Sequence, residues 1–92
     1  MSKKNQSVLH IKAHYKDVTK RLKRASGHLN KVISMIDENR KCIDISMQLH
    51  AVVKALIEAK KNLIHDHIEH YISDQNVNSS DLKEFKDITK FL

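Results

Sequence analysis

The chain has 92 residues, a formal net charge of +6 at pH 7, no proline and a single glycine. So short a chain forms one domain with a modest core of its own, and assembly with further copies is a natural way to bury more surface. Helix-forming residues dominate and aromatic residues are few, which predicts an all-helical protein.

The apolar pattern predicts that the protein neither spans a membrane nor is secreted. No stretch of 18 apolar residues occurs, and the first residues, MSKKNQS, lead into polar sequence instead of an apolar signal core. The single cysteine cannot form a disulfide within the chain, and a working thiol suits a reducing compartment. We therefore expect a cytoplasmic protein with no membrane partner.

Positive charge is concentrated in the first part of the chain. Residues 1–41 hold 11 Lys and Arg against 3 Asp and Glu, whereas residues 42–92 hold 6 against 8. This asymmetry indicates a surface for a polyanion in the first part. We expect residues 1–9 to form a flexible N-terminal arm and residues 10–92 to form a single helical domain.

The first predicted helix runs from Ile11 to Ile36, because its apolar residues recur at alternating intervals of four and three. Gly27 lies in mid-helix, where glycine costs about 1 kcal/mol relative to alanine, and we expect a close backbone neighbour there. The other side of this helix is basic, which fits either a polyanion-binding face or an ordinary solvated one. Its positions are Lys12, Lys16, Lys20, Lys23, Arg24 and Lys31, with Arg21 on the flank.

A second long helix is predicted over Cys42–Tyr71, because this stretch lacks glycine and proline. The short turn at residues 37–40 is predicted to fold it back on the first helix. The apolar surface of this second helix is too wide for one partner helix, which predicts contact with a second chain. The main seam is Cys42, Ile45, Leu49, Val52, Leu56, Ala59 and Leu63, and a second row is Val53, Ile57, Ile64 and Ile68.

The polar run 73–80 predicts a loop. Asp81 with Glu84 three residues later resembles a capping box, and the apolar residues that follow predict a short closing helix.

Metal-ligating residue types occur at both ends of the second helix. Thiolate and imidazole suit Zn, Ni, Co and Cu. Cys42 and His67 share a face but are 25 residues apart, or about 37 Å along a straight helix, so one chain cannot close a site with both. Two antiparallel copies could. His70 can share the face of His67, whereas His65 points about 200° away. The alternative stays open that Cys42 is a small buried residue and the histidines are solvated.

An enzyme is not expected. The thiol of Cys42 and the likely base in the histidine cluster are far apart in one chain, and the sequence has no recognisable nucleophile elbow or oxyanion hole. It also has no zinc finger, recognition-helix turn or aromatic-interleaved basic patch, so any DNA contact would rely on phosphates and DNA shape.

The segments RLKRASGHL, RKCIDISMQL and HDHIEH resemble the CsoR/RcnR/FrmR family of small bacterial repressors, over about residues 10–92. The resemblance implies a three-helix protomer that pairs as an antiparallel four-helix bundle and assembles into a disc-shaped homotetramer, a dimer of dimers. It implies a repressor that binds operator DNA and releases it when an inducer occupies a site made by Cys42 and His67 of a second copy. The DNA-contacting positions that it implies are Arg21 and Arg24, with Lys16, Lys20, Lys23 and Lys31 on the same helix.

The inducer follows from the remaining ligand positions of the family. His10 matches a histidine that completes the site in nickel and cobalt sensors. The fourth position, usually Cys in copper sensors and His in nickel and cobalt sensors, is Tyr71 here, with His70 one residue earlier. We therefore expect nickel or cobalt, with zinc or copper as alternatives.

Two other functions remain as alternatives. Formaldehyde sensors of the family use a proline amine near the N-terminus, where this chain has Ser2. A metal-buffering helical bundle would bind the same ions without binding DNA.

Overall fold

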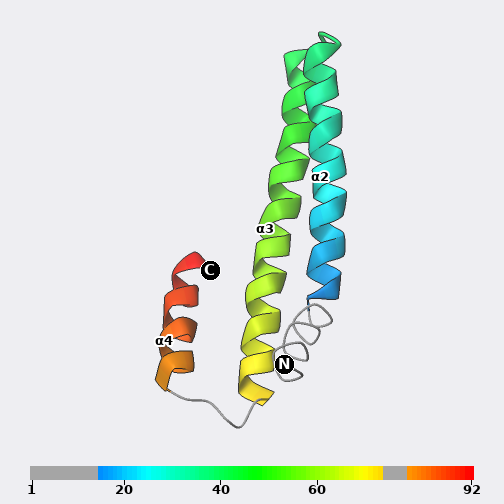
Figure 1. Ribbon diagram of the computed structural model, residues 1–92. Helices are drawn as coiled ribbons and strands as arrows, with labels where there is room; N and C mark the ends of the chain where they lie inside the picture. The colour runs from blue at the N-terminus through cyan, green and yellow to red at the C-terminus, as the bar shows by residue number, and fades with distance from the viewer. Residues whose placement is uncertain (1–14, 74–78) are drawn as a thin grey trace.

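The structure, a computed structural model, describes residues 15–73 and 79–92. Helix α2 (Lys16–Asp37) and helix α3 (Cys42–Ser73) form a long antiparallel hairpin. Helix α4 (Ser79–Ile88) and the short 3-10 helix η1 (Thr89–Phe91) lie beside the C-terminal half of α3, on the side away from α2 (Figure 1). The described ranges contain helices and no strand, which confirms the predicted all-α fold with two long helices and a short one. The predicted arm 1–9 and the helix start at Ile11 lie outside them.

The hairpin turns where the sequence predicts. The N–H of Arg40 donates to the carbonyl of Met35 at 3.0 Å and that of Asn39 to the carbonyl of Ile36 at 3.1 Å, while Asn39 has φ 56°. These two bonds around a left-handed residue form a Schellman motif, which satisfies the last carbonyls of α2 and reverses the chain. Asparagine adopts this conformation more readily than most residues.

About half of the positions in each predicted apolar seam are buried and form the core of the hairpin. In α2 the buried residues Val18, Ala25 and Val32 recur every seven positions, and they pack with Val52 and Ala59 of α3. The intervening seam positions are 39–56% exposed in α2 and 40–43% exposed in α3, so these halves are not core. They are Leu22, Leu29 and Ile36 in α2, and Leu49, Leu56 and Leu63 in α3.

Three local predictions are wrong. Ile64 is buried instead of extending the exposed row of Val53 and Ile57, because this part of α3 also borders Tyr15 and η1. A Cβ built on Gly27 meets nothing within 4 Å, so no close neighbour from the described chain explains this glycine. Helix α4 begins at Ser79, which places Asp81 in its first turn instead of at the cap.

The chain exposes more surface than a compact protein of its size. Its accessible surface is 7673 Å², whereas a compact monomer of 10.7 kDa exposes about 5,500 Å². Its radius of gyration is 17.7 Å, against about 12 Å for a compact domain of this length. No helix in the described part of the chain is long and apolar enough to cross a membrane.

Candidate metal centre and nucleic-acid interface

An exposed apolar stripe runs along α3 and has a candidate ligand near each end. Leu49, Leu56 and Leu63 follow Cys42 at intervals of seven residues, and each is 40–43% exposed. An α-helix turns about 100° per residue, so Cys42 and His67 lie within about 20° of each other around its axis. Both candidate ligands therefore lie on the same side of α3 as the stripe.

Cys42 is the first residue of α3 and is exposed, with its Sγ 3.8 Å from the Ser46 hydroxyl. The alternative that Cys42 is simply a small buried residue is therefore wrong for the isolated chain. An exposed thiol at the end of the apolar stripe is accessible to a group from another chain.

His67 is half-buried near the other end of α3 and contacts the start of α2. Its Nδ1 lies 3.1 Å from the hydroxyl of Tyr15, and its Nε2 has less than 1 Å² of accessible surface. Burial, together with the negative charges of Asp66 and Glu84, raises the pKa of Tyr15 above 10.0. The phenol therefore stays protonated at neutral pH, and its O–H can donate to Nδ1. Sequence reasoning missed this contact, because no local pattern links residues 52 positions apart.

One chain cannot hold a metal ion between Cys42 and His67. Helix α3 is continuous from Cys42 to Ser73, so the predicted separation of about 37 Å applies. The donor types, thiolate and imidazole, fit a borderline transition metal. The two residues suit such an ion only when a second copy supplies one of them.

Two further histidines, His65 and His70, lie close to this end of α3. His65 is exposed on the opposite side from His67, as predicted, and its Nε2 lies 3.7 Å from a Glu69 carboxylate oxygen. Ligand atoms of His65, Asp66 and Glu69 lie within 4.8 Å of one another in an exposed surface cluster. His70 is half-buried. His10 and the side chain of Tyr71 lie outside the described residues.

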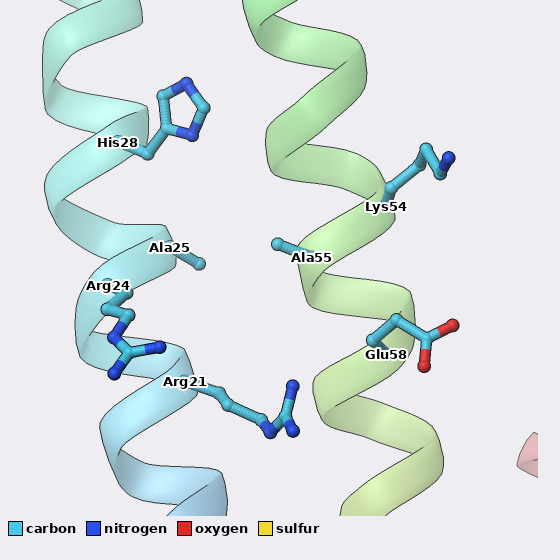
Figure 2. Close-up of a pocket in the computed structure, with 7 residues that line it drawn as sticks. All are labelled: Arg21, Arg24, Ala25, His28, Lys54, Ala55 and Glu58. Carbon is cyan, nitrogen blue, oxygen red and sulfur yellow. The ribbon is translucent and has the colours of Figure 1, made fainter.

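A basic groove of about 290 Å³ lies between α2 and α3, opposite the apolar stripe. Figure 2 shows Ala25 and Ala55 facing each other across it, with Arg21 extending from α2 toward α3. Lys54 and Glu58 line the α3 side. The six predicted DNA-binding residues are all exposed: Lys16, Lys20, Arg21, Lys23, Arg24 and Lys31.

Sequence reasoning missed two of the residues that line this groove, Lys54 and His28. Lys54 belongs to the part of the chain with a net negative charge, which directed attention away from it. His28 also lines the groove, and its Nε2 lies 2.7 Å from the side-chain oxygen of Gln48. Only the packing of α2 on α3 reveals that both helices line one basic groove.

Helical geometry places the basic and apolar groups on opposite flanks of the hairpin. Relative to the buried Ala25, Leu22 lies about 60° to one side around α2 and Arg24 about 100° to the other. Leu22 is 45% exposed, and Arg24 lines the groove. The hairpin therefore presents one apolar face and one basic face.

Comparisons with known proteins find similar transcriptional repressors. The chain is 34% identical to the copper-sensing transcriptional repressor CsoR of Bacillus subtilis over 77 residues, which cover 80% of this chain and 76% of that protein. It is 37% identical to the copper-sensing repressor RicR of Mycobacterium tuberculosis over 59% of this chain and 56% of that protein. It is 41% identical to CsoR of Mycobacterium ulcerans over 53% of this chain and 42% of that protein. No solved structure gives a significant match.

The family comparison covers nearly all of the described chain. The model of the metal-sensitive transcriptional repressor family matches residues 14–91, a range that includes the basic face, Cys42 and His67. The family and the relatives named above are repressors and not enzymes, in agreement with the sequence prediction. This chain belongs to the metal-sensitive transcriptional repressor family.

Proposed function

We propose that this protein represses transcription by binding operator DNA through the basic face of α2. It releases the DNA when a transition metal ion is ligated by Cys42 of one chain and His67 of an antiparallel second copy. The observation that carries the proposal is the placement of Cys42 and His67 at opposite ends of one continuous helix, on the side of its exposed apolar stripe. Antiparallel packing along this stripe brings each Cys42 beside the other copy's His67.

The excess surface supports assembly. The chain exposes about 2,200 Å² more than a compact monomer of its mass, whereas a standard interface buries about 800 Å² per partner. One such interface leaves much of the excess uncovered, which supports more than one contact per chain. A dimer formed along the α3 stripe and a homotetramer made of two such dimers are the assembly that we propose.

Nickel or cobalt is the inducer that we propose, with zinc as an alternative. The chain has one cysteine, so each site between two chains receives a single thiolate from Cys42. Copper(I) prefers soft sulfur ligands, whereas imidazole suits nickel and cobalt as well. His10 would complete the ligand set, and Tyr71 or His70 occupies the remaining position. Copper is the main competing inducer, because the relatives named above are described as copper-sensing.

The DNA contact that we propose is made chiefly to phosphates. Arg21 and Arg24 lie at the groove between the helices, and Lys54 adds a cation from α3. Arginine side chains bind phosphate oxygens in a bidentate manner, and such contacts make affinity strongly dependent on salt. Operator selection would then come largely from the shape of the DNA.

Release follows from thermodynamic linkage. An ion that binds one arrangement of the antiparallel helices more tightly than another shifts the population toward it, and a coupling of about 1–3 kcal/mol changes DNA affinity roughly 5- to 150-fold. Because Cys42 must be deprotonated and His67 neutral to bind the ion, metal affinity falls as the pH falls. We place this repressor in the cytoplasm, where it meets its operator.

The test is fluorescence anisotropy with labelled DNA from the promoter of the protein's own operon. We expect the metal-free protein to bind this DNA and nickel or cobalt to release it at lower free concentration than zinc or copper(I). The variant Cys42→Ala should bind DNA equally well and fail to release it. Normal release by this variant would contradict the site, and metal binding without any DNA affinity would indicate a buffering protein. Release by formaldehyde alone would indicate an aldehyde sensor.

A further inference from the structure

Within the described chain, side-chain hydrogen bonds connect α3 with α2 near the turn and with the residue before α2 at the open end of the hairpin. Close to the turn, His28 Nε2 lies 2.7 Å from the Gln48 side-chain oxygen. At the open end, the Tyr15 hydroxyl lies 3.1 Å from His67 Nδ1. Tyr15 immediately precedes Lys16, the first residue of α2. The second bond therefore connects a proposed metal ligand to the beginning of the proposed DNA-binding helix.

Neither ring nitrogen of His67 is open to an ion in this conformation. Nδ1 is hydrogen-bonded to the Tyr15 hydroxyl, and Nε2 has less than 1 Å² of accessible surface. The neighbouring Ile64 is 5% exposed and lines the same pocket as His67 and Tyr15. Moving the Tyr15 side chain away from His67 removes the hydrogen bond at Nδ1, whereas uncovering Nε2 requires the side chains packed around it to move. Nδ1 is therefore the nitrogen for which an ion would compete with the Tyr15 hydroxyl.

We propose that Tyr15 is a positioning residue that holds His67 in the DNA-binding state and competes with the metal ion for Nδ1. This inference rests on the proposed function, in which His67 is a ligand. Metal ligation then breaks the Tyr15–His67 hydrogen bond, which joins the residue before α2 to α3.

The position of Tyr15 explains how the effect reaches the basic groove. Arg21 and Arg24 follow Tyr15 by six and nine residues on one helix, about 9 and 14 Å along its axis. A change in how the start of α2 is held against α3 therefore alters the positions of Arg21 and Arg24 relative to α3. A ligand shifts such an equilibrium only by its differential affinity for the two states, so one side-chain hydrogen bond supplies a modest share of the coupling.

The test is Tyr15→Phe, which keeps the ring and removes the hydroxyl. Cobalt(II) serves as the probe, because thiolate-to-cobalt charge transfer reports ligation by Cys42. We expect the variant to bind cobalt about three- to tenfold more tightly than the wild type, as expected when a competing hydrogen bond is removed. We also expect its metal-free form to bind operator DNA more weakly. A purely structural role for Tyr15 would leave cobalt affinity unchanged or lower it.

The matched control is Gln48→Met, which removes the His28–Gln48 hydrogen bond between α2 and α3 while keeping a side chain of similar length. It should leave cobalt affinity at the wild-type value. Equal affinities for Tyr15→Phe and the wild type, or equal gains in both variants, would overturn the role of Tyr15 while leaving the metal site intact. Cobalt binding that is unaffected by Cys42→Ala in the wild-type background would instead contradict the proposed function.

Discussion

The two faces of the α2–α3 hairpin differ in which groups they leave exposed. One face carries the apolar residues Leu49, Leu56 and Leu63, each 40–43% exposed, on the side of α3 that also carries Cys42 and His67. The other is a groove lined by Arg21, Arg24 and further polar residues around small alanines. In the proposed function, the apolar face packs against a second copy of the chain and the basic face binds DNA.

In the proposed function, assembly and the metal site therefore depend on the apolar face of the hairpin, and DNA binding depends on its basic face. Substitutions on the apolar face should affect assembly and, through it, the metal site. Substitutions on the basic face should affect DNA affinity while assembly and metal binding persist. Each face therefore provides a control for the other.

Leu56→Asp should have the largest effect, because it places a charge in the middle of the apolar stripe. A charge removed from water without a partner costs several kcal/mol, so the dimer dissociation constant should rise more than about a hundredfold. Sedimentation equilibrium measures this change, and circular dichroism checks that the helices persist.

The matched control is Met47→Asp. Met47 is 63% exposed and lies about 180° around α3 from Leu56, so the same kind of substitution there should leave assembly unchanged. Unchanged assembly in Leu56→Asp, or equal loss in both variants, would contradict the apolar face as the interface.

Arg21→Ala should have an intermediate effect confined to DNA. Losing one phosphate contact weakens binding across sequences and reduces the magnitude of the salt slope by about 1. Fluorescence anisotropy at several salt concentrations gives both quantities. Lys83→Ala, which removes one positive charge from α4, should leave the salt slope near the wild-type value. A slope equally reduced in both would mean that net charge, and not the groove, determines binding.

The helical pattern predicts the hairpin well but cannot assign each apolar position to a partner. Val18 and Leu22 belong to the same three-four alternation, yet Val18 is buried within the chain and Leu22 is 45% exposed. Contacts within a protomer and contacts between protomers obey the same spacing, so a single sequence does not distinguish them.

The candidate site likewise has one feature that the sequence predicts and others that depend on how the helices pack. The separation of Cys42 from His67 follows from helix rise alone, because no residue between them breaks α3. The contact between Tyr15 and His67 and the contribution of Lys54 to the groove depend on how α2 packs against α3. These contacts have no counterpart in local sequence patterns.

Gly27→Ala should have the smallest effect. The added Cβ meets nothing within 4 Å, and alanine is favoured over glycine in a helix interior by about 1 kcal/mol, so the protein should be stabilised. Thermal unfolding should show a midpoint increase of about 4–8 °C. A loss of assembly or of DNA affinity would show instead that another molecule closely approaches Gly27.

The most direct measurement of the shared site mixes two defective chains. Cys42→Ala and His67→Ala, co-expressed with different affinity tags, give a heterodimer with one intact pair, Cys42 from one chain and His67 from the other. Isothermal titration with cobalt should give one tight ion per heterodimer, two per wild-type dimer and none for either variant alone. A heterodimer that binds no better than the two single variants would contradict a metal site shared between antiparallel chains.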